Sequence, residues 1–217
     1  MAASQSNENC LRIGDIVTLK FTGQSAFLST EGILVEDVGV TTSIKPFEDN
    51  LFQVCIQLQY SAANGFEEFV EKFPGDLATI TDKETNKHLN ALMRGKHNEI
   101  AMNESFMKQK IGTLVKFGET IQLRHCKSRK FVTVKRNELA RDERENIAVS
   151  MTLDGSIDSW IQILPRYKIN KEGDFILNNT EVLLKISERS GEYLHCSEKE
   201  PPKVIGSIVA INLSSND

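Results

Sequence analysis

Residues 118–134, GETIQLRHCKSRKFVTV, have counterparts at 14–30, GDIVTLKFTGQSAFLST, and at 180–197, TEVLLKISERSGEYLHCS. Each stretch begins with alternating apolar and polar residues, passes through a polar turn, and continues with an aromatic residue followed by an aliphatic one. Alternation with period two on both sides of a turn is typical of a β-hairpin. The sequence therefore predicts three related hairpins.

A further apolar run follows each hairpin after an irregular stretch, and we interpret it as a strand that closes the unit. These runs are LFQVCIQL at 51–58, WIQIL at 160–164 and SIVAINL at 207–213. Trp160 aligns with Leu51, which predicts a place for Trp160 in the core. A repeated all-β unit removes its open sheet edges by closing on itself. We therefore expect one mainly β domain over residues 1–217, a β-trefoil of three hairpin-plus-strand repeats.

Residues 61–110 interrupt this pattern between the first and second repeats. SAANGFEEFVEKF places Phe66, Phe69, Val70 and Phe73 on one face of a short helix. The motif Thr81-Asp82-Lys83-Glu84 fits a capping box for a second helix, and Gly95 is expected to weaken or break that helix. The sequence predicts a helical arm inserted into the trefoil.

The overall composition is that of an ordinary globular protein, with 40% hydrophobic and 26% charged residues among 217. No apolar run approaches the roughly 20 residues that a membrane-spanning helix needs, and the first residues lack the apolar core of a signal peptide. The four cysteines form no CxxC pair and are expected to be buried thiols. These features favour a cytosolic setting without direct membrane insertion.

The run RHCKSRKFVTVKR at 124–136 contains six Lys or Arg residues, although the whole chain has a formal charge of -4. An acidic chain is a poor candidate for a nucleic-acid binder, because phosphate neutralisation dominates that affinity. Lys127, Arg129 and Lys130 are expected in the turn of the second hairpin. The equivalent turns, TGQSA and ERSGE, are not basic, so the fold does not require the charge. Solubility and recognition both remain as explanations.

No catalytic motif stands out, and we expect neither an enzyme, nor a cofactor, nor a metal site. The pairs His125-Cys126 and His195-Cys196 occupy non-equivalent positions and lack zinc-ligand spacing. The carboxylate pairs Glu67-Glu68 and Asp142-Glu143 lie in polar stretches, where we expect them to be solvated. A hydrolase or transferase on this fold is the last of the functions that the sequence suggests.

Several segments in order resemble the N-terminal suppressor domain of inositol 1,4,5-trisphosphate receptors and, more distantly, the N-terminal domain of ryanodine receptors. The resemblance covers nearly the whole chain. The segments are IGDIVTLKFTGQSAFLSTEG at 13–32, DNLFQVCIQLQYSA at 49–62, IGTLVKFGETIQLRHCKSRKFVTV at 111–134 and SWIQILPRYK at 159–168.

The resemblance implies a β-trefoil with a helical arm, at the start of a tetrameric calcium-release channel on the cytosolic face of the endoplasmic reticulum. Such a domain does not bind inositol trisphosphate itself. It packs on the ligand-binding core that follows in the chain, lowers the ligand affinity of that core and couples binding to gating. Neighbouring subunits of the tetramer are further partners. The alternative is a stand-alone trefoil that binds a ligand, such as an inositol phosphate, at the basic turn.

The resemblance also implies contact residues. The family's L-x-H-x-K-S turn matches RHCKS and assigns suppression to Lys127. The P-x-Y-K-L loop matches PRYKI and assigns a role in activation to Tyr167, which the residues alone leave open between an interface and local packing. The S-T-L-G-L-V segment matches STEGIL and offers Ile33 and Leu34 as interface residues.

Two positions depart from the family pattern. Glu31 stands where the family has leucine, and Glu48 stands where it has arginine. Both changes add negative charge near the expected contacts. How strongly this chain suppresses ligand binding therefore depends on how these carboxylates are placed.

Overall fold

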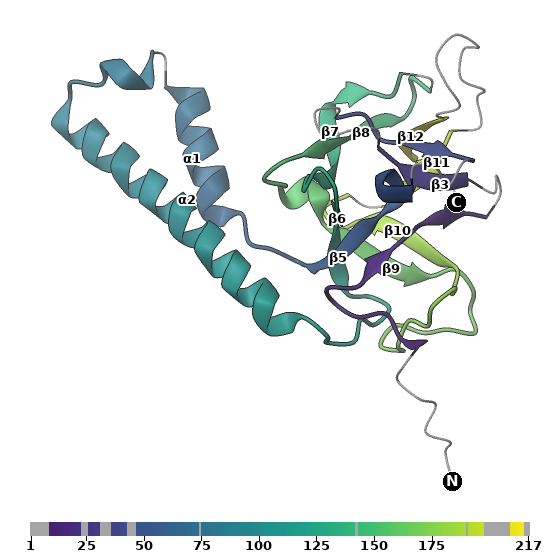
Figure 1. Cartoon of the computed structure of the whole chain (residues 1–217). Helices are drawn as coiled ribbons and strands as arrows, with labels where there is room; N and C mark the ends of the chain where they lie inside the picture. Colours follow the sequence, from purple (N-terminus) through teal and green to yellow (C-terminus); the bar gives the residue numbers. More distant parts are fainter. Residues whose placement is uncertain are drawn as a thin grey trace. The chain divides into compact units, whose positions relative to one another are not determined.

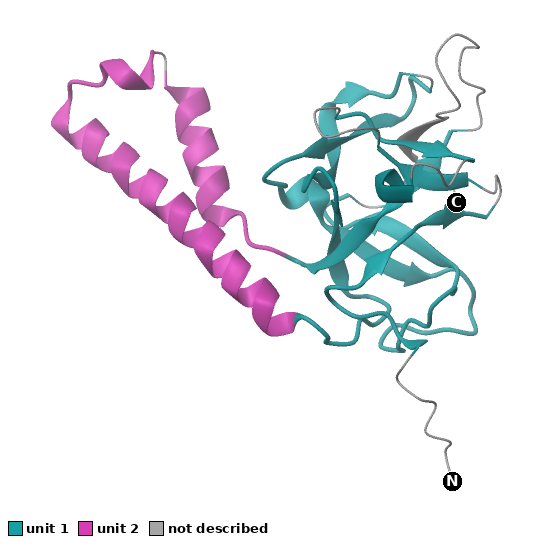
Figure 2. Cartoon of the chain, viewed as in Figure 1, with its two compact units in different colours: residues 1–57, 111–217 teal, residues 58–110 magenta. Residues whose placement is uncertain are grey.

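The computed structural model describes residues 9–22, 26–30, 36–42, 47–73, 75–141, 143–189, 191–197 and 209–214, the last of these for the backbone alone. In these residues the protein is mainly β, as predicted, with antiparallel strands and two α-helices (Figure 1). The chain divides into a β unit, Met1–Gln57 with Ile111–Asp217, and an arm unit, Leu58–Lys110 (Figure 2). No helix in the described part of the chain is long and apolar enough to cross a membrane.

The strands of the β unit fall into three successive sets, here called repeats 1, 2 and 3. Repeat 1 has β1 (Ile16–Val17), β2 (Lys20–Phe21), β3 (Ala26–Ser29), β4 (Gly39–Thr41) and β5 (Phe52–Ile56). Repeat 2 has β6 (Thr120–His125), β7 (Phe131–Leu139), β8 (Ile147–Thr152) and β9 (Ile161–Pro165). Repeat 3 has β10 (Val182–Ile186), β11 (Tyr193–Cys196) and β12 (Val209–Ser214). Short 3₁₀ turns, η2 (Phe47–Asn50) and η4 (Ile157–Ser159), precede β5 and β9.

The same pairing scheme recurs from repeat to repeat. β6 pairs along its length with β5, and β10 pairs in the same antiparallel way with β9. At their starting ends β1 and β6 also pair with the last strand of their own repeat, β5 and β9 respectively. Hairpins β3–β4 and β7–β8 and the pair β11–β12 continue the sheet beyond these strands. The hairpins predicted at 14–30, 118–134 and 180–197 are confirmed as the antiparallel pairs β2–β3, β6–β7 and β10–β11.

A closed ring of backbone hydrogen bonds joins the segments that lead into the three hairpins. The amide of Leu11 donates to the carbonyl of Ile176 at 2.8 Å, the amide of Ile176 to Val115 at 3.2 Å, and the amide of Val115 back to Leu11 at 2.9 Å. Val115 and Ile176 are buried. Buried backbone amides and carbonyls need hydrogen-bond partners. Here the segment before each hairpin supplies partners to the segments before the other two.

Each of these segments then turns sharply into its hairpin at an equivalent residue. Gly14, Gly118 and Asn179 all have positive φ, at 95°, 91° and 64°. The amides of Gly14 and Gly118 donate to β5 and β9, at the carbonyls of Val54 and Ile163. Only residues that tolerate the left-handed region fit such turns, which accounts for glycine twice and asparagine once.

The apolar run at 207–213 does not play its predicted role. It forms β12, which pairs with β11, β4 and β8, whereas the closing strands β5 and β9 pair with the first strands of repeats. β12 is therefore the counterpart of β4 and β8. The prediction was wrong because an apolar run indicates a buried strand without indicating its neighbours.

The core of the β unit consists of the inward side chains of the first and last strands. Phe52, Ile121, Leu123 and Ile161 are at most 2% exposed. Burying each contributes about 1.5–3 kcal/mol to folding. The prediction that Trp160 occupies this core was wrong, because Trp160 is only half-buried and the next residue, Ile161, is the one that points inward.

The arm unit is a pair of helices, α1 (Ser61–Lys72) and α2 (Lys83–Lys110), within the segment predicted to be helical. Gly95 does not break α2. A Cβ atom at Gly95 would lie 3.6 Å from Ala62 Cβ, so the small residue allows the two helices to approach. The amides of Ala62 and Ala63 donate to the Glu99 carboxylate at 2.9 and 3.0 Å, so α2 supplies the cap of α1.

The predicted capping box is shifted by one residue. Asp82, and not Thr81, accepts hydrogen bonds from the amide and hydroxyl of Thr85, at 2.7 and 2.6 Å. These bonds lower the pKa of Asp82. A short carboxylate at the start of a helix both satisfies a free amide and interacts favourably with the helix dipole.

We predict that Gly118→Ala destabilises the β unit by about 1–2 kcal/mol, because the alanine must adopt a positive φ. Asn179→Gly is the matched control at the equivalent turn, and it should change the free energy of unfolding by no more than a few tenths of a kcal/mol, roughly. Chemical denaturation of both variants checks the pair. Equal stability of Gly118→Ala and the parent chain would contradict the assigned turn.

Candidate functional site

The basic turn, defined as residues 126–130 between β6 and β7, is closed by the backbone. The amide of His125 donates to the carbonyl of Lys130 at 2.8 Å, and the amide of Arg129 donates to the carbonyl of His125 at 2.9 Å. Arg129 has a φ of 62°, so its backbone is left-handed. The backbone of the turn thus has a defined conformation.

The side chain of His125, at the end of β6, holds the basic turn in place from the core. Its side chain is fully buried and lies against the ring of Phe52, with ring centroids 5.3 Å apart. The amide of Ser128 donates to Nδ1 at 3.3 Å, and Nε2 lies 3.2 Å from the carbonyl oxygen of Glu48. Nδ1 therefore accepts and Nε2 carries the proton, which is the neutral form. Burial lowers the pKa of His125 and keeps it neutral.

Lys127, the residue that the resemblance assigns to suppression, is tied to the chain itself. Its Nζ lies 2.9 Å from Oδ1 of Asp49, whose side chain is only 7% exposed, while Lys127 is 31% exposed. The hydrogen bond to Asp49 raises the pKa of Lys127. The ammonium group is thus fixed in place and still reaches the surface.

Asp49 is a functional residue that could not be identified from the sequence pattern. It belongs to η2 and precedes β5, and the antiparallel register pairs Phe52 with His125. That register brings the residues just before β5 beside the residues just after β6. The acidic pair Glu48-Asp49 opposite a basic turn was the available signal, and it becomes visible only once the strand register is known.

Two further cations of the basic run, Arg124 and Lys130, each have a partner of their own. Arg124 donates to Gln53 Oε1 at 2.5 Å and lies over the ring of Phe131. Lys130 Nζ lies 3.8 Å from a carboxylate oxygen of Glu36. The positive charges therefore diverge to different acceptors and do not converge on one point, as a phosphate cradle would require.

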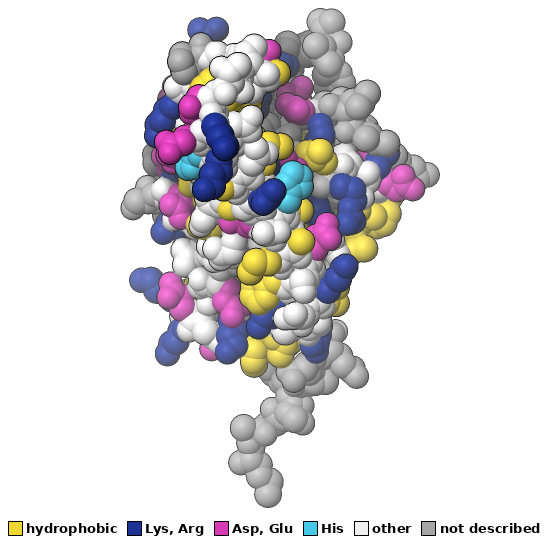
Figure 3. Space-filling model, turned by 90° about the vertical axis from the view of Figure 1, so that its left-hand side faces the viewer, with side chains coloured by type: hydrophobic (Ala, Val, Ile, Leu, Met, Phe, Trp, Pro, Cys, Tyr) yellow, Lys and Arg dark blue, Asp and Glu magenta, His cyan; other side chains and the backbone are white. Residues whose placement is uncertain are grey.

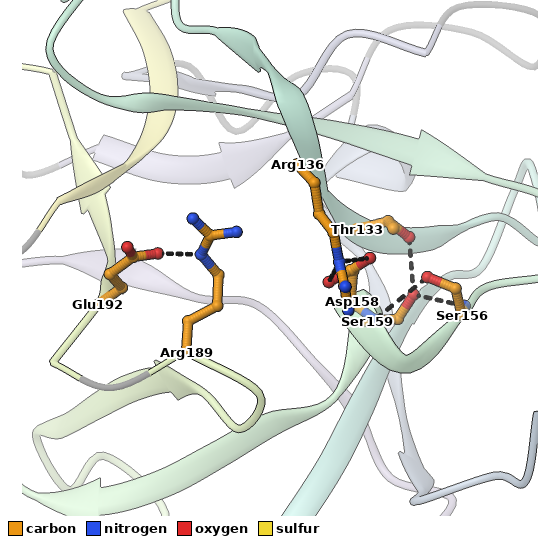
Figure 4. A network of polar contacts seen from close by, with 7 residues as sticks. All are labelled: Thr133, Arg136, Ser156, Asp158, Ser159, Arg189 and Glu192. Atoms are coloured by element: carbon orange, nitrogen blue, oxygen red, sulfur yellow. Dashed lines mark hydrogen bonds and ion pairs between the residues drawn. The ribbon is translucent and has the colours of Figure 1, made fainter.

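Arg136 extends this pattern beyond the turn. Its Nε donates to both carboxylate oxygens of Asp158, at 2.7 and 2.8 Å, in the network of Figure 4. In the same network Thr133 and Ser159 share a hydrogen bond of 2.7 Å, and Ser156 and Ser159 form the capping box of η4. These bonds fasten η4 to β7.

On the face that Figure 3 shows, charges of both signs are interspersed with hydrophobic side chains.

Tyr167 lies in the connection between β9 and β10 and is 55% exposed. Its hydroxyl donates to Glu181 Oε2 at 2.7 Å, and this bond raises the pKa of Tyr167. The ring is therefore oriented but uncovered by the described residues. Ile33 and Leu34, and also Glu31, fall outside the described residues, so these contacts stay predictions.

Glu143 corrects one expectation, that the Asp142-Glu143 pair is solvated. Its side chain is buried and accepts from the Ser197 hydroxyl and from the Asn146 amide, each at 2.6 Å. His195 Nε2 lies 3.6 Å from the same carboxylate. The polar sequence around Glu143 hid a buried structural link between the β7–β8 hairpin and the end of β11.

The cysteines are free thiols, as predicted, and only Cys126 is partly exposed. Burial raises the pKa of both Cys55 and Cys196 to about 11. Thiols of that pKa stay protonated at neutral pH and are poor nucleophiles. These two cysteines are packing residues.

A family model and a related protein that match this chain both belong to the same receptor family. The family model described as "Inositol 1,4,5-trisphosphate/ryanodine receptor" matches residues 6–215. The inositol 1,4,5-trisphosphate receptor itr-1 of Caenorhabditis elegans is 30% identical over 190 residues. That match takes in 82% of this chain and 6% of the length of the worm receptor, so this chain corresponds to a small part of that protein.

Two solved structures share the fold. A C. elegans protein of unknown function superimposes with a TM-score of 0.62 and 11% identity, covering 98% of this chain and 93% of that one. The SDF2-like protein from Arabidopsis thaliana has a TM-score of 0.60 and 14% identity, covering 96% and 90%. At these identities the likeness concerns the fold alone.

We predict that His125 makes the stability of the β unit depend on pH. Its pKa is lowered in the folded state, so below about pH 6.5 the unfolded chain takes up a proton first. The contribution is present above that pH and is lost as the pH falls toward the folded pKa. Melting curves between about pH 7.5 and 5.5 should show this loss, and His125→Gln should remove part of the slope. His97→Gln, on the exposed surface of α2, is the control, and equal slopes for all three chains would contradict the assignment.

Proposed function

Because the chain belongs to the inositol 1,4,5-trisphosphate/ryanodine receptor family, we propose that it is the regulatory domain of an intracellular ligand-gated calcium-release channel. In this proposal it packs on an adjacent inositol trisphosphate-binding core of the same polypeptide, lowers the ligand affinity of that core and transmits ligand binding to gating. The family match over residues 6–215 is the observation that carries the proposal. The family is one of receptors and not of enzymes.

We further propose that the β unit is a β-trefoil. The support is the repeated arrangement of the segments before the hairpins, with the hydrogen-bond ring of Leu11, Val115 and Ile176 and the left-handed turns that follow it. The arm unit is then an insertion between repeats 1 and 2. In this proposal the parent channel is a tetramer in the endoplasmic reticulum membrane, this domain lies on its cytosolic face, and neighbouring subunits are further partners.

The geometry of the basic turn supports a contact role over direct ligand binding. A phosphate group is best held by several cations that point at one place. Here Arg124, Lys127 and Lys130 are each drawn to a different partner within the chain. A fixed and partly exposed ammonium, such as that of Lys127, suits a domain contact in which its position decides the interaction.

Regulation of this kind needs no catalytic group. A domain that packs better on the unliganded arrangement of its neighbour lowers the ligand affinity by the difference between the two packing free energies. Such coupling free energies are typically about 1–3 kcal/mol. Lys127 and Tyr167 are the described residues that we assign to the contact, and Ile33 and Leu34 are assigned to it by resemblance.

The second candidate is a trefoil that binds an anionic ligand by itself. The observation in favour of this second candidate is that the Arg129 side chain is exposed at the tip of the turn. We rank it below the regulatory role because the neighbouring cations are engaged within the chain.

We predict that deleting residues 1–217 from a longer receptor fragment that contains the ligand-binding core raises its affinity for inositol trisphosphate about 5–150-fold. The reason is that the core no longer has to give up its contact with this domain on binding ligand. Equilibrium binding of radiolabelled ligand to both fragments measures the effect. Identical affinities would contradict the regulatory role.

In the intact fragment, we predict that Lys127→Ala raises the ligand affinity about threefold or more, which is part of the full coupling. Alanine is chosen because a glutamate would place a second carboxylate beside the buried Asp49. Lys135→Ala, at another cation of the same run, is the matched control and should leave the affinity unchanged. An equal response to both substitutions would show that net charge, and not the position of Lys127, matters.

For the second candidate, calorimetry on residues 1–217 alone is decisive. We predict no binding of inositol trisphosphate at concentrations up to about 0.1 mM, a range in which a specific site with micromolar affinity would saturate. Saturable binding that Arg129→Ala abolishes would favour the stand-alone ligand site instead.

A further inference from the structure

Thr81, in the arm unit, is left without the capping role that its sequence context predicts. Asp82 takes the capping position instead and accepts the hydrogen bonds of Thr85. The Thr81 side chain is exposed, and among the described residues its hydroxyl has no hydrogen-bond partner. This hydroxyl is therefore open to a reaction from the solvent side.

The residues that follow Thr81 carry a distinct charge pattern. The first and third of them, Asp82 and Glu84, are acidic, and both side chains are exposed. Protein kinases choose their substrates partly by charge patterns around the acceptor residue. A hydroxyl that is followed by these two carboxylates suits a kinase whose substrate groove is basic, because opposite charges across a contact give specificity.

The same charge pattern occurs at one other place in the sequence, Ser197-Glu198-Lys199-Glu200. There the acceptor is inaccessible, because Ser197 is only 1% exposed and its hydroxyl donates to the buried Glu143 carboxylate at 2.6 Å. A kinase must bring the acceptor hydroxyl in line with the γ-phosphate of ATP and against its own catalytic carboxylate. The fold therefore separates two sites that the sequence alone presents as equivalent.

Thr79, two residues before Thr81, is a weaker candidate for the same reaction. It has a carboxylate at the third following position, Asp82, but the residue directly after it is Ile80. Its hydroxyl also donates to the carbonyl of Asp76 at 2.7 Å, in the 3₁₀ turn η3 (Leu77–Thr79). Thr81 combines exposure, a hydroxyl without a partner in the described chain, and two following carboxylates.

The backbone around Thr81 fits into a kinase groove with little loss of structure. Residues 80–82 lie between η3 and α2, and Ile80 is extended, with a φ of −66° and a ψ of 106°. Glu84 belongs to the first turn of α2, and that turn must open for an extended fit. In α2, which is described over its whole length, no side chain before Leu89 is buried. Opening of a helix end that covers no buried side chain costs little free energy.

We propose that Thr81 is a phosphorylation site for a protein kinase that recognises acidic residues after the acceptor. In the reaction the Thr81 hydroxyl oxygen attacks the γ-phosphorus of MgATP. The bond from that phosphorus to the oxygen bridging to the β-phosphorus breaks, and ADP leaves. The hydroxyl proton passes to the catalytic carboxylate of the kinase. The inference goes beyond the proposed function and does not rest on it, since the acceptor and its recognition residues belong to the arm unit.

Phosphorylation changes the charge at one end of the arm. The connection between α1 and α2 lies at the end of the helix pair opposite to where the chain enters α1 and leaves α2 (Figure 1). A phosphothreonine there adds about 1.5–2 negative charges at neutral pH and three strong acceptor oxygens. A partner with arginine or lysine side chains then gains charge-assisted hydrogen bonds that the unmodified arm does not offer.

The test is phosphorylation of the folded chain, residues 1–217, with MgATP and casein kinase 2, a kinase of acidic substrates. Incorporation of radiolabelled phosphate gives the rate, and fragmentation mass spectrometry assigns the modified residue. Thr81→Ala removes the acceptor, and Thr81→Ser keeps a hydroxyl in its place. Glu84→Gln removes one recognition carboxylate at nearly constant shape, and Glu68→Gln, at an exposed carboxylate of α1, is the matched control. Circular dichroism before the reaction verifies that each variant is folded.

We expect phosphate on Thr81 in the parent chain, none at this position in Thr81→Ala, and phosphate again in Thr81→Ser. Glu84→Gln should slow the reaction at Thr81 at least about tenfold, because a charged hydrogen bond to the kinase is lost. Glu68→Gln should react at the rate of the parent. An unmodified Thr81, phosphate on Thr79 or Ser197 in its place, or equal rates for Glu84→Gln and Glu68→Gln would overturn the proposal.

Discussion

The ring of backbone hydrogen bonds among Leu11, Val115 and Ile176 is the constraint on which the β unit depends. Each repeat donates to one neighbour and accepts from the other, so none of the three leading segments is satisfied alone. Because the bonds are made by the main chain, the ring tolerates different aliphatic side chains in the three repeats. The left-handed turns at Gly14, Gly118 and Asn179 follow from it, since each segment must reverse sharply to start its hairpin.

This scaffold explains how an acidic chain holds several cations of a basic run at separate places within the described residues. The hairpin of β6 and β7 needs its apolar positions and leaves the charges to be placed by their neighbours. Asp49 forms an ion pair with Lys127, and Asp158 forms an ion pair with Arg136. Each cation is thereby held at a fixed position on a rigid sheet. A surface of fixed charges suits recognition of a neighbouring domain, where the arrangement of charges gives specificity more than affinity.

The hairpins and the arm helices could be predicted from the sequence, because period-two alternation and helical spacing are local signals. The ring could not, because Leu11, Val115 and Ile176 lie in stretches too short and irregular to show a period. Partners distant in the chain were also missed, such as Asp49 for Lys127, because they depend on strand register. The prediction that β12 is a closing strand was wrong for the same reason. An apolar run predicts burial, and only pairing decides which repeat it completes.

The central claim is that this domain and a neighbouring ligand site are energetically coupled, and such coupling is reciprocal. Ligand bound to the neighbour must therefore weaken the contact made by this domain. Hydrogen exchange of the turn between β6 and β7, in a receptor fragment that contains both parts, reports that contact directly. The account predicts that saturating inositol trisphosphate speeds exchange of residues 126–130, while the amides of Leu11, Val115 and Ile176 stay protected. Exchange in the turn that is the same with and without ligand would contradict the account.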